Sequence, residues 1–265
     1  MKICISYRGL SYMEKFVNHH GVCTFSMMSV VENHFKYIVE PLRSNGHDVV
    51  FALSTNESPI LQDLINIFQP VYVSVDGSDQ MDRSRDMLNN VTDVTHFILL
   101  RCDLKMKCFI TEIPIQWDRM NFPWLNFDRK FARNGDVIFA FPMTIKKHVS
   151  ESFHQLHTYF RMKGEIPHGH GLFKRFFQNK SIPYTTMVSD MYNSNTDVTQ
   201  NPIFTLARSF DINVPLHSKV KKSINVIDRH KNFQVKLFQY LRLANASAFF
   251  KYEGSSNGKN FKTLP

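Results

Sequence analysis

Short apolar runs alternate with segments of helical periodicity over the first hundred residues. The apolar runs predict strands over residues 2–6, 48–54, 71–75 and 95–101. Apolar residues at helical spacing predict helices over residues 30–42, 61–68 and 80–90. Because strands that alternate with helices form right-handed crossovers, this order predicts an α/β fold whose mostly parallel sheet is flanked by helices on both faces.

Beyond residue 103 the pattern becomes mixed. It predicts further strands over residues 108–116, 136–143 and 184–188. Helices are predicted over residues 146–162, 172–178 and 232–243. We therefore expect a second region that no longer follows the regular strand and helix alternation of the first.

The chain carries a formal net charge of +9 and has a pI near 9.4. This balance favours an anionic partner, which could be nucleic acid, an acidic membrane surface or the phosphates of a small substrate. The densest basic cluster, Lys219, Lys221 and Lys222, is short and interrupted, which is typical of a solvated face and not of a nucleic-acid-binding arm. We therefore expect no nucleic-acid partner.

The four cysteines form no C-x-x-C pair, which favours a reducing compartment. The N-terminal apolar run is too short for a signal peptide, and no stretch approaches the roughly 20 apolar residues of a membrane span. We therefore expect a soluble cytoplasmic protein without stable membrane insertion.

Polar residues follow each predicted strand of the first half, where ligands bind in parallel α/β sheets. They are Arg8 and Gly9, Ser54 to Glu57, Asp76 to Ser78, and Arg101 to Asp103. The chain has neither a G-x-G-x-x-G after the first strand nor a P-loop, which argues against a dinucleotide site and a P-loop enzyme. A bound diphosphate would then need another neutralising group, and a divalent cation held by the strand-end carboxylate of Asp103 would provide one.

The segment from His96 to Leu104 resembles the metal-binding edge of GT-A glycosyltransferases, in which a hydrophobic strand ends in a D-x-D motif or a reduced variant of it. Only the last acidic residue, Asp103, is present, and Arg101 occupies the position of the first. Three short motifs also resemble the small glycosyltransferases with which algal large DNA viruses (chloroviruses) build capsid glycans. They are Ile5-Ser-Tyr-Arg-Gly, Arg101-Cys-Asp-Leu and Asn193-Ser-Asn-Thr followed by Asn201-Pro, and the resemblance spans about residues 1–208.

This resemblance implies a GT-A-like domain over residues 1–265. Its parts would be a nucleotide-sugar-binding half (1–103), an acceptor and catalytic half (104–215) and a C-terminal helix and tail (216–265). The implied activity is metal-dependent transfer of a sugar from a UDP-sugar, first of all UDP-xylose, to a hydroxyl of a glycan or glycoprotein. The cation would be Mn²⁺ or Mg²⁺, and a viral enzyme would act in the host cytoplasm.

Five residues are implied to contact the donor, namely Arg8, Thr55, Arg83, Arg101 and Asp103. Each also has a structural interpretation. Arg8 could be a surface residue or pair with Glu57, Thr55 could cap a helix, and Arg83 could form an intrahelical ion pair. Asp103 could pair with Arg101, although a carboxylate after five apolar residues is costly to bury without a cation, which favours a metal or ribose role.

The acceptor side needs a general base if the reaction inverts the anomeric configuration. Asp190, after the predicted strand 184–188, is the first candidate, and Glu112, Asp118 and Asp136 compete with it. A capping role in a polar loop is the alternative for Asp190, and a retaining enzyme would need no such base.

Two further features could belong to the acceptor side. His168 and His170 lie in a glycine-rich loop, and His170 is predicted to complete the metal site, although a flexible acceptor loop explains the same pattern. Trp117, Phe122 and Trp124 could stack on sugar rings or fill the core.

Two other classes of protein remain as alternatives. A methyltransferase or another Rossmann-like nucleotide enzyme is disfavoured by the missing glycine-rich loop and by the missing acidic residue at the end of the second strand. A non-catalytic RNA- or glycan-binding protein would use the positive charge and would show salt-sensitive binding that ignores metal.

Overall fold

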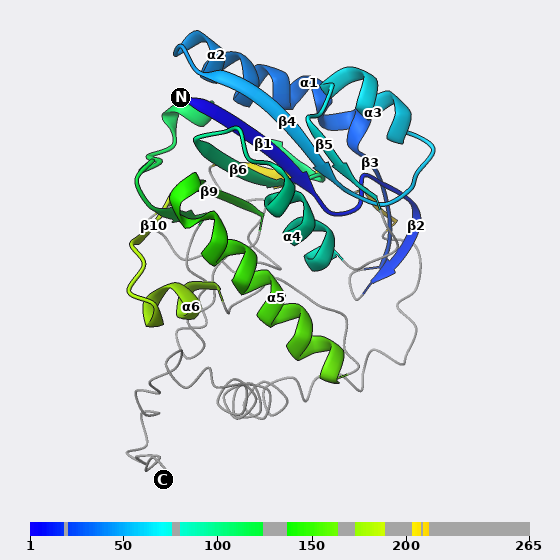
Figure 1. Cartoon of the computed structure of the whole chain (residues 1–265). Helices are drawn as coiled ribbons and strands as arrows, with labels where there is room; N and C mark the ends of the chain where they lie inside the picture. The colour runs from blue at the N-terminus through cyan, green and yellow to red at the C-terminus, as the bar shows by residue number, and fades with distance from the viewer. Residues whose placement is uncertain are drawn as a thin grey trace.

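A computed structural model of the 265-residue chain describes residues 1–18, 21–75, 80–123, 137–163, 173–188, 203–207 and 209–211. It shows an α/β fold whose central seven-stranded sheet is mostly parallel and is flanked by helices, a Rossmann-like arrangement (Figure 1). The fold class predicted from the alternating pattern is therefore confirmed at this level. The predicted C-terminal helix over residues 232–243, and all of residues 216–265, lie outside the described residues.

The central sheet has two parts that differ in strand direction. In order across the sheet, its strands are β10 (Tyr184–Thr186), β8 (Met120–Phe122), β9 (Ile138–Pro142), β6 (His96–Arg101), β1 (Lys2–Arg8), β4 (Asp48–Ser54) and β5 (Tyr72–Ser74). The last four run parallel to one another. β9 runs antiparallel to both of its neighbours, β6 and β8, and β10 pairs in parallel with β8. The change in strand direction follows the change in sequence pattern after residue 103.

Helices cover both faces of this sheet, as the two-sided burial of its strands requires. One face is covered by the consecutive helical turns η1 (Met27–Val30), α1 (Val31–His34), η2 (Phe35–Val39) and α2 (Glu40–Ser44), and by α3 (Leu61–Phe68). The other face is covered by α4 (Gln80–Asn90), α5 (Lys146–Lys163) and α6 (Phe173–Asn179), as Figure 1 shows. Within β1 the side chains alternate accordingly: Ile5 and Tyr7 pack toward the first group of helices, and Cys4 packs toward the second.

Two parts of the fold differ from the expectations. The segment after β1 forms a hairpin, β2 (Tyr12–Asn18) and β3 (Gly21–Ser26), to which β12 (Ser209–Asp211) adds a third strand. The strand predicted over residues 108–116 is wrong, because the segment forms the 3₁₀ turn η3 (Ile110–Glu112) and no strand. A second 3₁₀ turn, η5 (Met143–Ile145), follows β9. In η3 the Glu112 carboxylate accepts the Phe109 N–H at 2.9 Å, and Pro114, which has no N–H, follows. In this segment, hydrogen bonds between neighbouring residues of the turn take the place of the predicted strand pairing.

No helix within the described ranges is both long enough and apolar enough to cross a bilayer.

Candidate functional site

The order of the parallel strands reverses between β1 and β6. From β1 the chain runs outward to β4 and then β5, and it returns to the opposite side of β1 as β6. In open α/β sheets ligands bind beyond the carboxyl ends of the strands at such a reversal. Arg8 ends β1 and lies in register with Arg101, which ends β6. Two residues predicted from sequence to contact the donor therefore stand side by side at the expected binding edge.

Ser54 extends this edge toward β5. It ends β4, lies in register with Arg8 on one side and with Ser74 on the other, and its side chain is fully buried. Its Oγ finds no hydrogen-bond partner among the residues that the structure describes. Sequence reasoning placed Ser54 at a strand end but did not select it. The alternation of side chains along a strand could have indicated it. Ser54 lies two residues after Ala52, so both side chains point to the sheet face that α4 covers, and the in-register Arg8 points to the same face.

The first turn of α4 reaches the same edge. Gly9 follows β1 with a φ of +105°, a conformation that favours glycine, and a Cβ placed there would lie 3.4 Å from Nε2 of Gln80. Arg83 belongs to that turn and is buried. On the same helix the Arg85 guanidinium lies 3.5 Å from the Asp82 carboxylate, an intrahelical ion pair of the kind considered for Arg83. A donor contact of Arg83 stays a prediction.

Arg8 is not a surface residue, because only 1% of it is exposed. Its guanidinium carbon lies 5.5 Å from the centroid of the Phe139 ring on β9, within cation–π range. A guanidinium keeps its charge when buried, so such a site must surround it with aromatic faces, acceptors or anions. The fold therefore holds a buried positive charge, that of Arg8, at the carboxyl end of β1.

Thr55 follows Ser54 and has a clear structural task. Its hydroxyl oxygen accepts the Ser11 N–H at 3.0 Å, and its own N–H donates to the Ser74 carbonyl at 3.0 Å. These bonds tie the segment after β1 to β4 and β5. Thr55 is thus a local anchor and not a helix cap, and its contact with a donor stays a prediction.

Asp103 forms a two-pronged ion pair with Arg101. Nε of Arg101 donates to one carboxylate oxygen at 2.9 Å and Nη2 donates to the other at 2.6 Å. Only 4% of the Asp103 side chain and 16% of the Arg101 side chain are exposed. Of the two interpretations of the sequence at this position, the structure shows the ion pair.

The described residues around Asp103 do not fit a divalent cation. Both carboxylate oxygens already accept hydrogen bonds from a guanidinium, whose positive charge would repel a cation placed on the same oxygens. In the part of the chain that the structure describes, no three His, Cys, Asp or Glu side chains come together as a metal site would require. His168 and His170, the predicted additional ligands, lie outside the described residues.

Cys102, between Arg101 and Asp103, is buried and not reactive. Burial is the first cause that raises the pKa of its thiol far above the usual value, and the neighbouring Asp103 carboxylate adds to the shift. Because a thiol must ionise to act as a nucleophile, Cys102 serves here as a small apolar side chain.

The segment after Asp103 is held from several directions. It continues as β7 (Leu104–Met106), which pairs with β11 (Phe204–Leu206), and the Asp103 carbonyl accepts the Ala207 N–H at 2.8 Å. The side chain of Asn33 on α1 bonds both backbone groups of Met106. These bonds fix the backbone that carries the ion pair.

His34 adds a buried, pH-sensitive contact to this segment. It stacks on Tyr7 with ring centroids 5.3 Å apart, and its Nε2 lies 2.6 Å from the Leu104 carbonyl. A carbonyl only accepts hydrogen bonds, so Nε2 carries the proton and Nδ1 is the bare nitrogen of a neutral ring. Burial lowers the pKa of His34 from 6.5 to about 4.

This shift predicts acid sensitivity. The unfolded chain binds a proton at His34 below pH 6.5 while the folded chain does not until about pH 4, so stability is fully present above pH 6.5 and is lost as the pH falls toward 4. Between pH 7 and pH 5 the free energy of unfolding is expected to fall by about 2 kcal/mol. Urea denaturation at both pH values measures it. His34→Asn should flatten the dependence, whereas an unchanged slope would contradict the assignment.

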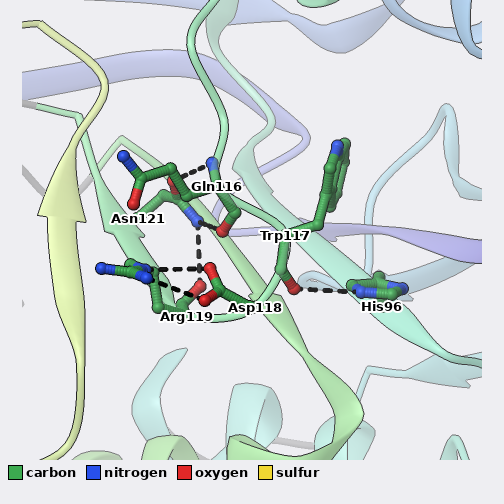
Figure 2. A network of polar contacts seen from close by, with 6 residues as sticks. All are labelled: His96, Gln116, Trp117, Asp118, Arg119 and Asn121. Atoms are coloured by element: carbon green, nitrogen blue, oxygen red, sulfur yellow. Dashed lines mark hydrogen bonds and ion pairs between the residues drawn. The ribbon is translucent and has the colours of Figure 1, made fainter.

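Two of the candidate bases, Asp118 and Glu112, lie far from the carboxyl ends of the parallel strands. Figure 2 shows Asp118 bonded by both prongs of Arg119, at 2.9 and 2.8 Å, in a network that also contains Asn121 and His96. His96 begins β6 and Arg101 ends it, so this network lies at the opposite, amino edge of the sheet. Glu112 closes η3, which packs against α2. Both residues thus lie away from the carboxyl ends of β1, β4 and β6, and their role as a base stays a prediction that this placement does not favour. Asp136 and the first candidate, Asp190, lie outside the described residues.

For the transferase that the sequence resemblance implies, Asp118→Asn is expected to leave activity and substrate affinity unchanged, because the Asp118 carboxylate is exposed and pairs with Arg119. Steady-state kinetics of the variant beside the parent protein would show this. A large fall in kcat would place the reaction at the amino edge instead.

The three aromatic candidates, Trp117, Phe122 and Trp124, lie in different places. Phe122 is completely buried and packs edge-on against Phe139 and Phe177, so of the two interpretations the core position is confirmed. Trp117 lies edge-on to His96, with centroids 5.4 Å apart, at the amino edge. Trp124 lies outside the described residues.

A scan against models of known protein families finds no match to this chain, and a search of curated protein sequences finds no significant match either.

Proposed function

We propose that this protein is a GT-A-type glycosyltransferase that moves a sugar from a nucleoside diphosphate donor, first of all UDP-xylose, to a hydroxyl of a glycan or glycoprotein. The observation that carries the proposal is the pair of arginines, Arg8 and Arg101, in register at the strand-order reversal. A diphosphate is a ligand that suits two neighbouring guanidinium groups, since both are permanent cations with several N–H donors for phosphate oxygens. The mixed strands β8 to β10 that follow the parallel half support a separate acceptor side.

The reaction joins an acceptor oxygen to the anomeric carbon of the donor sugar. As that bond forms, the bond from the anomeric carbon to the diphosphate oxygen breaks, and its electron pair leaves with the nucleoside diphosphate. The proton of the acceptor hydroxyl passes to a carboxylate base, for which Asp190 is the candidate, and inversion follows. The arginines stabilise the negative charge that develops on the leaving diphosphate.

The strand ends disfavour one competing class of protein. An enzyme that binds an adenosine ribose uses an acidic residue at the end of the second parallel strand, where this chain has Ser54. A protein that binds RNA through its charge would bind in a salt-sensitive way, which the ligand panel below tests.

Thermal denaturation with a panel of ligands tests the proposal. UDP and UDP-xylose are expected to raise the melting temperature, because a ligand that binds the native state stabilises it by mass action. S-adenosylmethionine and a short RNA are expected to have no effect. Stabilisation by S-adenosylmethionine alone, or by RNA alone, would overturn the proposal, and release of UDP from UDP-xylose in the presence of a glycan acceptor would support it further.

A further inference from the structure

We infer that arginine and serine side chains at the strand ends neutralise and bind the donor diphosphate, without a divalent cation held by Asp103. The inference rests on the proposed function, since it concerns how the same edge of the sheet holds the same substrate. It departs from the expectation that Asp103 coordinates Mn²⁺ or Mg²⁺.

The first step is the occupation of Asp103. Each of its oxygens accepts a hydrogen bond from Arg101, at 2.9 and 2.6 Å, and the pair is shielded from solvent. A cation ligated by those oxygens would replace the guanidinium or stand against its charge in a poorly screened environment. At the first position of the D-x-D-like motif, where a metal site would need a carboxylate, this chain has the positively charged Arg101.

The second step is the role that the pair leaves to Asp103. By bonding Nε and Nη2, the carboxylate fixes the plane of the Arg101 guanidinium at the end of β6. Asp103 is therefore a positioning residue for Arg101, and the backbone bonds around β7 fix Asp103 in turn.

The third step is the neighbouring strand ends, which supply what a diphosphate needs. Arg8 lies in register beside Arg101 and brings a buried positive charge. Ser54 lies in register on the other side of Arg8, and its buried Oγ has no partner within the described ranges of the chain. An unpartnered buried hydroxyl is costly, and a phosphate oxygen would accept a hydrogen bond from it. Charge and hydrogen bonding therefore come together across three adjacent strands.

The binding test compares UDP titrations in EDTA with titrations in Mn²⁺, by calorimetry on the whole protein. We expect UDP to bind in EDTA with an affinity that Mn²⁺ leaves unchanged. Binding that appears only with Mn²⁺ would overturn this inference and leave the proposed glycosyltransferase standing. Absence of UDP binding in both buffers would overturn the proposed function itself, so the two failures are distinguishable.

The variant test uses Ser54→Ala with Ser152→Ala as its matched control. Ser152 is a buried serine on α5 whose Oγ bonds the Val149 carbonyl at 2.6 Å. Ser54→Ala is expected to weaken UDP binding in EDTA by about tenfold while the free protein melts no lower, since the lost hydroxyl had no partner to lose. Ser152→Ala should leave UDP affinity unchanged. A Ser54→Ala protein with the parent affinity, or one that is destabilised without losing affinity, would overturn the inference.

Discussion

Arg8→Gln is expected to lower kcat/KM for transfer from UDP-xylose by about 10²- to 10³-fold, the usual cost of removing one preorganised group that stabilises developing charge. Arg8 ends the central strand, is buried against Phe139 and is in register with Arg101. Glutamine keeps much of the length of the side chain and its hydrogen-bonding capacity but removes the charge. Initial rates of UDP release over a range of donor concentrations measure the effect.

Two further variants test whether the effect of Arg8→Gln comes from the lost charge at this position. Arg8→Lys keeps the charge without the planar fork and is expected to recover only part of the activity. Arg119→Gln is the matched control, because the same substitution then falls at the amino edge, where Arg119 pairs with Asp118. Circular dichroism checks that the variants are folded. If Arg8→Gln only lowers the melting temperature and leaves kcat/KM unchanged, Arg8 has no part in donor binding.

Asp103→Ala is expected to reduce the free energy of unfolding by about 3 kcal/mol in the absence of donor and metal, near the lower end for breaking a buried ion pair. The reason is that the substitution removes the carboxylate that accepts two hydrogen bonds from a guanidinium that is only 16% exposed. Urea denaturation followed by circular dichroism measures the loss.

The double variant Arg101→Met with Asp103→Leu separates the ion pair from other roles of these residues. Replacing both charges with apolar side chains avoids the lone buried charge, so the double variant is expected to recover most of the stability that Asp103→Ala loses. It should still lose donor affinity, because Arg101 is gone. Asp103→Ala with unchanged stability but a lost response to Mn²⁺ would contradict the pairing and restore the metal ligand.

Elements built from local periodicity were predicted closely. The helix Gln80–Asn90 and the strand Asp48–Ser54 begin and end as the sequence pattern indicated, because helical spacing and a bounded apolar run are properties of neighbouring residues. The hairpin of β2 and β3 and the short strand β8 were missed. These strands depend on partners elsewhere in the chain, such as β12 for the hairpin and β9 for β8, and a local pattern does not record such partners.

The sequence by itself determined that Arg8, Arg101 and Asp103 lie at or just after the ends of two strands of a parallel sheet, because an apolar run and the polar residues after it are adjacent in the chain. Only the tertiary structure decided that β1 and β6 are neighbours, that Asp103 bonds Arg101, and that Asp118 lies at the far edge. The physical reason is that strand order and register arise from pairing between distant segments. Whether a carboxylate contacts a guanidinium or a metal ion depends on atoms that lie about 3 Å apart. Those atoms come that close only once the strands have paired.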